Sequence, residues 1–382
     1  MRRYSNYRRT PDRRKRSKRM RKSNHFFTLI LLTIFFICFA PLFSKLRKTN
    51  TVASARDTAQ EVYTTELVIS RPPAAMDEMI VAPIPKLKFN SSSKSVLTLS
   101  DIASDSAILY DKSTNTILYS KNKDKHCFPA STTKVITALV AIENVPLDTQ
   151  FTVGTELTLL QPDSSLAYLN QGNVVTLEDL LYALLLPSGN DAAYVIAVNT
   201  ARIVSENPSL SDTDAVKYFC SLMNQEAQQC GADNSNFQDP DGYHNMFHYT
   251  TAEDMLRIVL KAQEYPVLCD IVRAPYRETN IVSGEGFYWE NGNCLVTENN
   301  PYFLSFATGF KTGFTDEAGY CMTATAVSGD KDLVAVIFNA PTLKGRYTDA
   351  AKLFYSEIAP DKLVSMSEAE VSQAAETAQT DQ

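Results

Sequence analysis

An uncharged stretch near the N-terminus constrains this chain more than any other feature of its sequence. It runs from Phe26 to Phe43, FFTLILLTIFFICFAPLF, without one charged residue. A membrane-spanning helix needs about 20 predominantly apolar residues, and this stretch falls within the range that spans. Residues 1–25 carry twelve Lys or Arg and one Asp, and such basic flanks stay in the cytoplasm. We therefore expect a basic cytoplasmic arm at 1–25, a single transmembrane helix at 26–46 that anchors the chain in the cell membrane, and an extracytoplasmic remainder.

Two other interpretations of this end compete with the membrane anchor. Ala53-Ser54-Ala55 resembles a signal-peptide cleavage site. It lies beyond three further basic residues, and the apolar stretch exceeds the usual hydrophobic region of about 7–15 residues, so the pattern favours an uncleaved anchor. A basic arm can also bind nucleic acid, but the adjoining span makes attraction to anionic lipids the simpler explanation. The expected partner is the lipid bilayer, with no nucleic acid.

The remaining chain separates into a linker, one folded domain and a tail. Residues 47–97 are polar, rich in proline and without a helical or strand period, which predicts a stalk. Residues 98–358 begin with a hairpin, continue with apolar helices and end with β-branched strands and one helix. That order predicts an α+β fold in which an antiparallel sheet packs against a helical cluster. Residues 359–382 have five acidic residues and no aromatic residue, and we expect a disordered acidic tail.

The first motif that suggests chemistry is Ser131-Thr132-Thr133-Lys134, at the start of an apolar helix. Residues i and i+3 of a helix share one face, so the lysine amine can take the serine proton if burial lowers the lysine pKa. Alone, this spacing is weak, because Ser91 and Lys94 repeat it in the polar linker. A helix N-cap and a solvated lysine are the alternative interpretation.

Two later motifs complete a set. Ser188-Gly189-Asn190 lies at a break between two predicted helices, and Lys311-Thr312-Gly313 opens a predicted strand. Taken singly, the first is an ordinary turn and the second a charged strand edge. In this order, however, S-x-x-K, S-x-N and K-T-G are the set found in β-lactamases and penicillin-binding proteins.

The likeness extends beyond these motifs. The segments PASTTK, LEDLLYALLLPSGNDAA, FQDPDGYHNMFHYTTAEDM and TGFKTGFTDEAGY follow one another along the chain. Together they resemble the serine D-alanyl-D-alanine carboxypeptidases of the low-molecular-weight penicillin-binding protein class, peptidase family S11, over about residues 98–358. The resemblance implies a β-lactamase/transpeptidase-like fold with its site in the cleft between sheet and helices.

The resemblance also implies a role for each motif residue. Ser131 would be the acylated nucleophile, Lys134 its general base, Ser188 a proton relay to the leaving D-alanine, and Asn190 a contact to the substrate and the lysine. The remaining substrate-binding residues would be Lys311, Thr312, Gly313, Phe314 and Arg346. Among these, Lys311, Thr312 and Arg346 would bind the terminal carboxylate, and the backbone N–H of Phe314 would join that of Ser131 in the oxyanion hole.

We therefore expect a membrane-anchored serine carboxypeptidase that trims the terminal D-alanine of peptidoglycan stem peptides, without metal or cofactor, and that β-lactams inhibit. Phe314 departs from the polar or ionisable ring that relatives often have there, and we expect neither the family's second, all-β domain nor its C-terminal anchor in this protein. A β-lactamase or transpeptidase is one alternative, although no clear deacylating Glu is seen. An inactive peptidoglycan-binding scaffold is another. The six cysteines after the span are left open between disulfides and buried thiols.

Overall fold

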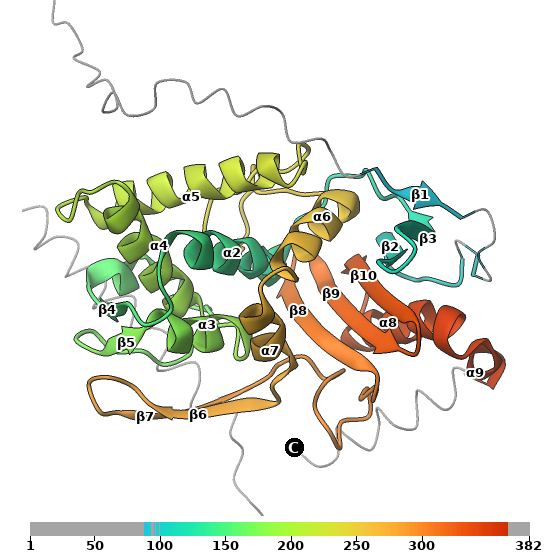
Figure 1. Ribbon diagram of the computed structural model, residues 1–382. Coiled ribbons are helices and arrows are strands. Elements are labelled where there is room, and N and C mark those ends of the chain that lie inside the picture. The colour runs from blue at the N-terminus through green and yellow to red at the C-terminus, as the bar shows by residue number, and fades with distance from the viewer. Residues whose placement is uncertain (1–87, 93–94, 96, 99, 366–382) are drawn as a thin grey trace, which may run out of the picture. The chain divides into compact units, whose positions relative to one another are not determined.

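The computed structural model describes residues 88–92, 95, 97–98 and 100–365 (Figure 1). The basic arm, the predicted transmembrane helix and most of the predicted stalk lie outside these residues, as does 366–382. No helix among the described residues is both long and apolar enough to cross a membrane. The span at 26–46 therefore stays a prediction from sequence.

A six-stranded sheet forms one half of the fold, with strand order β1-β3-β2-β10-β9-β8. The strands are β1 Asn90–Ser91, β2 Ser106–Asp111, β3 Thr116–Lys121, β8 Ala307–Thr315, β9 Gly319–Ser328 and β10 Lys331–Ala340. All neighbours pair antiparallel except β1, which runs parallel to β3. The sheet is thus mixed rather than purely antiparallel as predicted, because a two-residue strand from the linker joins its edge through backbone pairing.

Both faces of the sheet are buried, and strand β10 shows how the sequence achieves this. Leu333, Ala335 and Ile337 belong to a core that also contains residues of helix α8 (Leu343–Ile358), whereas the alternate residues Val334, Val336 and Phe338 belong to the core on the helical side. Side chains alternate between faces along a strand. A nearly continuous apolar run is therefore required wherever both faces are covered.

Helices form the other half and cover both faces of the sheet (Figure 1). In chain order they are η3 Ala130–Thr133, α2 Lys134–Asn144, η4 Thr155–Leu159, α3 Leu177–Leu185, α4 Asn190–Val204, α5 Asp212–Gln229, α6 Ala252–Ala262, α7 Pro266–Arg273, α8 and α9 Pro360–Ser365. Helices α2 to α5 cluster beside the sheet, α6 and α7 lie against it, and α8 covers the opposite face (Figure 1). Two further ribbons pair β4 Gln150–Thr152 with β5 Val174–Thr176, and β6 Tyr276–Asn280 with β7 Gly286–Glu290.

The helix starts follow the local capping chemistry. The Thr176 side chain accepts a hydrogen bond from the Asp179 backbone N–H, and the Thr251 side chain accepts one from the Asp254 backbone N–H, so these threonines cap helices α3 and α6. The closing helix α8 begins at Leu343, where the Thr342 side chain accepts a hydrogen bond from the Gly345 backbone N–H.

Two short elements lie beyond the predicted domain limits of 98–358. Strand β1 falls in the predicted stalk, and helix α9 falls in the predicted tail. Neither is long enough to show a hydrophobic period in the sequence. The folded region therefore extends past both limits.

Candidate active site

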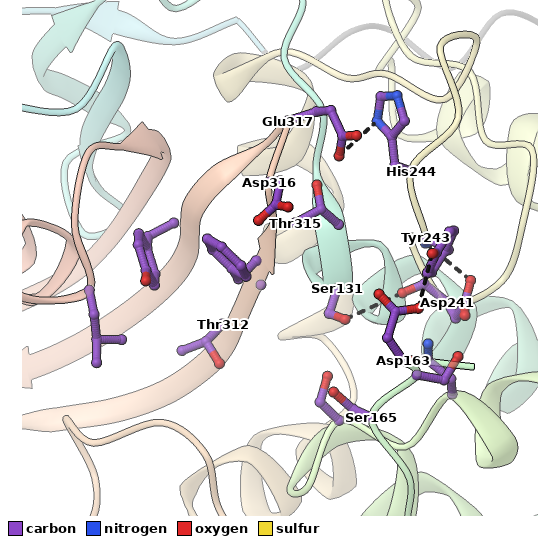
Figure 2. Close-up of a pocket in the computed structure, with 18 of the residues that line it drawn as sticks. Ser131, Asp163, Ser165, Asp241, Tyr243, His244, Thr312, Thr315, Asp316 and Glu317 are labelled. Carbon is purple, nitrogen blue, oxygen red and sulfur yellow. Dashed lines mark hydrogen bonds and ion pairs between the residues drawn. The ribbon is translucent and has the colours of Figure 1, made fainter. Parts of the chain in front are cut away.

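A cavity of about 620 Å³ lies between the helical cluster and β8, the edge strand of the sheet (Figure 2). Seven of the sequence-predicted residues line it: Ser131, Ser188, Asn190, Thr312, Gly313, Phe314 and Arg346. The other two, Lys134 and Lys311, are buried. All nine are thus gathered from the two halves of the fold, while the roles inferred for them stay predictions.

The first motif places a serine hydroxyl beside a buried amine. Ser131 lies in the single turn η3, and Lys134 is the first residue of α2. Their three-residue separation puts Lys134 Nζ 2.8 Å from Ser131 Oγ. The Lys134 side chain is fully buried, so its amine is withdrawn from water at the point where a proton has to leave the serine.

Two neighbouring oxygen atoms accept hydrogen bonds from the Lys134 amine. Nζ donates to Asn190 Oδ1 at 2.7 Å and to the backbone carbonyl of Asp241 at 2.8 Å. Both oxygens can only accept, and a neutral amine has two N–H groups and one lone pair. When both N–H groups point at these carbonyls, the lone pair is left for the Ser131 hydroxyl. The geometry therefore suits Lys134 as the acceptor of the serine proton.

Electrostatics favour the same protonation state. Burial lowers the pKa of Lys134 to about 8, against the opposing influence of Asp241, Asp239 and Asp191. The pKa of the Asp241 carboxyl is raised, mainly by burial and then by the neighbouring Asp239. Burial thus outweighs the attraction of the surrounding acids for the ammonium, and part of the Lys134 population is neutral near neutral pH.

The second motif supplies the helical wall of the cavity. Ser188 adopts the left-handed conformation, φ +65°, in the turn between α3 and α4. The next residue has to be small, because a Cβ on Gly189 would lie 2.8 Å from the carbonyl oxygen of Ala183. Asn190 follows this turn as the first residue of α4, and its amide oxygen accepts a hydrogen bond from Lys134 Nζ.

The third motif supplies the strand wall. A Cβ on Gly313 would lie 2.8 Å from the backbone nitrogen of Ser131 and 3.0 Å from that of Thr132. Only glycine lets β8 approach the nucleophile turn this closely. Because β8 is an edge strand, alternate backbone N–H and C=O groups along it face away from β9.

Two buried cations lie at this wall without an acidic partner among the described residues. Lys311 Nζ donates only to the carbonyl of Thr312, 3.0 Å away. Arg346, on α8, donates to the carbonyls of Gly313 and Cys321 and to the Tyr347 hydroxyl, while its Nε is buried without a hydrogen bond. Burial, followed by the charges of Lys134 and Arg346, lowers the pKa of Lys311 well below its ordinary value. Such a region favours an incoming anion.

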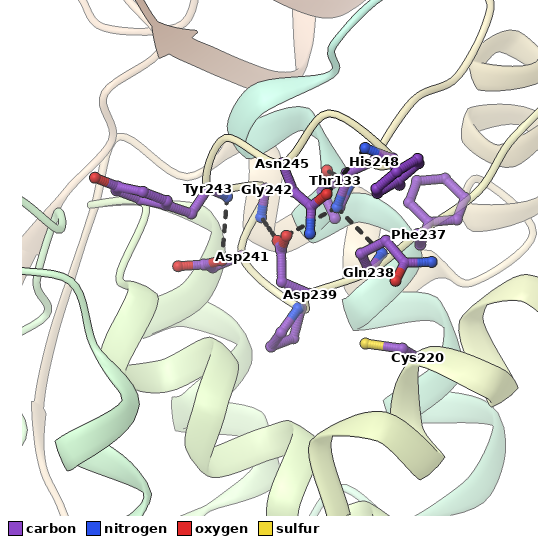
Figure 3. Close-up of polar contacts among 12 residues, drawn as sticks. Thr133, Cys220, Phe237, Gln238, Asp239, Asp241, Gly242, Tyr243, Asn245 and His248 are labelled. Carbon is purple, nitrogen blue, oxygen red and sulfur yellow. Dashed lines mark hydrogen bonds and ion pairs between the residues drawn. The ribbon is translucent and has the colours of Figure 1, made fainter. Parts of the chain in front are cut away.

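The structure adds a loop to which sequence reasoning assigned no role (Figure 3). It contains Asp241, whose carbonyl receives the Lys134 hydrogen bond. The loop packs against the nucleophile turn so closely that a Cβ on Gly242 would lie 1.9 Å from the Ala130 carbonyl oxygen. The segment FQDPDGYHNMFHYTT was one block of the resemblance, but a backbone carbonyl leaves no signature in residue types.

The same loop holds the nucleophile turn through a buried histidine (Figure 3). His248 Nε2 lies 2.9 Å from Thr133 Oγ1, and Nδ1 lies 3.0 Å from an Asp239 carboxylate oxygen. Thr133 stands between the nucleophile and Lys134 in the chain. His248 therefore holds the first motif in place through Thr133.

No disulfide links the six cysteines that the structure describes; all are free thiols. Within the described part of the chain, no group of three His, Cys, Asp or Glu side chains is placed to hold a metal ion.

Comparison with known proteins adds an independent line of argument. The sequence profile of the D-alanyl-D-alanine carboxypeptidase family, Peptidase_S11, matches residues 90–342. The chain belongs to this family. A D-alanyl-D-alanine carboxypeptidase of Streptomyces sp. strain K15 is 31% identical over 267 residues, which cover 67% of this chain and 88% of that protein. The carboxypeptidase DacF of Bacillus subtilis strain 168 is 30% identical over 251 residues, 65% of this chain. The chain spans 60% of the length of DacF.

Solved structures share the fold of this chain. The crystal structure of the Streptomyces K15 DD-transpeptidase matches with a TM-score of 0.61 and 29% identity, over 68% of this chain and 98% of that one. Penicillin-binding protein D2 of Listeria monocytogenes, in its ampicillin-bound form, matches with a TM-score of 0.55 and 23% identity, which bears on the fold alone. The predicted DD-peptidase architecture of sheet and helices is confirmed.

Proposed function

We propose that this protein is a membrane-anchored serine D-alanyl-D-alanine carboxypeptidase that removes the terminal D-alanine from peptidoglycan stem peptides. The observation that carries the proposal is the placement of Lys134. Its amine touches the Ser131 hydroxyl while two carbonyl oxygens occupy its remaining N–H groups. At the strand wall, Lys311 and Arg346 have no acidic partner among the described residues and can therefore bind an anionic group. A peptide that ends in a carboxylate, with its last amide bond at the serine, satisfies both halves of the site.

Acylation follows from this geometry. Lys134 accepts the Ser131 proton as Oγ attacks the carbonyl carbon of the penultimate D-alanine. The backbone N–H groups of Ser131 and Phe314 would stabilise the oxyanion. As the C–N bond breaks, the proton passes through Ser188 to the amine of the departing D-alanine. The peptide is left as an ester on Ser131. Water then attacks this ester, with the same lysine as base, and regenerates the free hydroxyl.

The residues at the strand wall would bind the terminal carboxylate of the substrate. Lys311 and Thr312 lie on β8, with Arg346 on α8 behind them. A carboxylate placed here gains charge-assisted hydrogen bonds and neutralises part of a buried positive region. β-Lactams combine an anionic group with a strained amide, so we expect them to occupy the same positions and to acylate Ser131.

The anchor and the location outside the cytoplasm are part of the proposal. The uncharged stretch Phe26–Phe43 and the basic residues before it support them. Full-length protein is expected to sediment with membranes, with its C-terminus accessible only from outside. A mature N-terminus near Arg56 would instead reveal a cleaved signal peptide.

Intact-mass analysis of the full-length chain with benzylpenicillin tests the activity. We expect one covalent adduct, which peptide mapping places on Ser131, and none in a Ser131→Ala variant. A label on Ser91, or no label at saturating drug, would refute the proposed nucleophile. Release of D-alanine from a diacetyl-lysyl-D-alanyl-D-alanine peptide then separates an active enzyme from a scaffold.

Transfer to an amine is a second candidate fate of the acyl-enzyme, because the matched K15 structure is named a DD-transpeptidase. Adding a D-amino acid acceptor to the peptide reaction distinguishes the two. Hydrolysed product alone supports a carboxypeptidase, and acceptor-linked product supports a transpeptidase.

A further inference from the structure

Two acidic side chains meet near the end of helix α2 that lies farther from the active site. Helix α2 begins at Lys134, and Glu143 is its tenth residue, so about 14 Å of helix separates the two. The Glu143 carboxyl is hydrogen-bonded to that of Glu226 on α5, a residue that is only 5% exposed. Helices α5 and α6 both pack against α2 (Figure 1). We call Glu143 and Glu226 the carboxyl pair.

The positive charge beside the carboxyl pair is shared with a third acid. Lys261 Nζ, on α6, lies 3.8 Å from a Glu143 carboxylate oxygen. The same amine lies closer to Glu264, at 2.8 Å. One ammonium therefore serves three carboxyls, and it cannot neutralise the pair when both Glu143 and Glu226 are ionised.

Two further titratable groups face the pair as hydrogen-bond donors. The Tyr265 hydroxyl, just after α6, donates to Glu143 Oε1 at 2.7 Å. The Cys230 thiol, at the end of α5, donates to Glu226 Oε1 at 3.4 Å. Burial raises the pKa of both groups, that of Tyr265 to about 12. Both therefore stay protonated near neutral pH, and they bring no charge to the pair.

The contact between the two carboxyls requires a proton. An ionised carboxylate has only acceptors, so two carboxyls form a hydrogen bond only when one of them is protonated. Glu226 is the more deeply buried, since the Glu143 side chain is 20% exposed. Burial, followed by the contact with Glu143, raises the pKa of Glu226 to about 7. The proton therefore resides on Glu226, which donates it to Glu143.

We propose that the carboxyl pair is a pH-dependent clasp, which joins α2 to α5 while it holds one proton and weakens when that proton is lost. Glu226 binds its proton more tightly in the folded than in the unfolded chain. The stabilisation is therefore complete below about pH 4.5 and is lost as the pH rises through about 7. The clasp does not depend on the proposed carboxypeptidase chemistry, because neither acid lines the catalytic cavity.

Thermal unfolding of the full-length chain at about pH 5 and about pH 8.5 tests the clasp. Glu226→Gln replaces the protonated acid with a neutral amide, which can donate to Glu143 at both pH values. Between the two pH values, the Tm of this variant relative to wild type should rise by roughly 3–8 °C. Glu143→Gln should shift in the same direction, because Glu226 then faces an amide instead of a carboxylate. Glu298→Gln, the same change at an exposed acid between β7 and β8, is the matched control and should show no such rise.

Infrared difference spectra detect the proton itself. The spectrum of wild type minus that of Glu226→Gln should contain the C=O stretch of a protonated carboxyl at about pH 6, and this band should vanish by about pH 8.5. The clasp would be overturned by the absence of this band at pH 6. It would also be overturned by a Tm difference that stays constant or falls between the two pH values, or by an equal rise in Glu298→Gln.

Discussion

Two buried lysines serve the same cavity, and their surroundings differ. Lys134 makes three hydrogen bonds, to a serine, an amide and a backbone carbonyl, and has three aspartates in its vicinity. Lys311 makes one, to the carbonyl of its neighbour, and its nearest charges are Lys134 and Arg346, both cations. The first lysine is held in place for proton transfer. The second lysine has no acidic partner among the described residues and is available to bind an anionic group of the substrate. We therefore expect that removing Lys134 and removing Lys311 will affect the reaction differently.

The largest effect should come from Lys134→Ala. Ser131 then has no base, so acylation by every substrate should fall by at least about 10²–10⁴-fold, the usual range for general-base help. The losses should be larger because nucleophile and base act as a unit. Stopped-flow acylation by a peptide and by a β-lactam measures this. Lys134→Arg is the sharper control, since arginine keeps the charge but cannot accept a proton at ordinary pH; a fast Lys134→Arg variant would contradict the assignment.

Gly313→Ala should come next. The new Cβ would lie 2.8 Å from the Ser131 nitrogen, so β8 must move away from the nucleophile turn. We expect acylation to fall by roughly 10–100-fold, since a shift of about 1 Å can cost 10²-fold. Gly292→Ala is the matched control, because its Cβ would meet only the Leu186 carbonyl oxygen at an ordinary 3.5 Å. Wild-type acylation by Gly313→Ala would show that the close approach is dispensable.

The pH profile tests the protonation state of Lys134. Because the neutral amine is the base, the acylation rate should rise with pH as the ammonium loses its proton, with a midpoint near 8. Asp241→Asn removes the acid that does most to raise the pKa of Lys134 and keeps the backbone carbonyl. The midpoint should therefore move to lower pH. A midpoint that stays in place, or moves upward, would mean that this carboxyl does not act on the lysine.

The smallest effect is expected for His248→Gln. The variant loses the ring that joins Thr133 to Asp239, but no group that touches the substrate. A loss of about three- to tenfold in acylation is expected, as for one lost hydrogen bond of roughly 1 kcal/mol. His244→Gln, a change at the cavity rim, should affect acylation by β-lactams less. If His248→Gln abolishes acylation, the histidine does more than hold Thr133 in position, and the structural role assigned to it is wrong.

Many residues of this site could be predicted from the sequence because their reactive groups are side chains that recur at fixed spacing. Helical periodicity predicts that Ser131 and Lys134 lie on the same face. Gly313 is predictable because strand β8 can approach the nucleophile turn closely only where it has no side chain. The Asp241 carbonyl was missed because any residue type can provide a backbone oxygen.

The fold shows the same division. Strand β10 was predicted from its β-branched residues, since burial on both faces demands them. Strand β1 was assigned to the linker because two residues that pair only through their backbone carry no period. Sequence thus predicts elements that bury side chains better than elements that only complete a sheet edge.

The most direct test of the division between the two lysines uses Lys311→Ala with two acyl donors. One donor is a peptide that ends in a D-alanine carboxylate, and the other is an uncharged thioester with the same acyl group. Loss of a charge-assisted hydrogen bond worth about 1.5–3 kcal/mol should lower kcat/KM for the peptide by roughly 10–100-fold. The thioester should react nearly as before, because Lys134 still serves it. An equal loss on both donors would place Lys311 in the proton-transfer machinery and contradict the account.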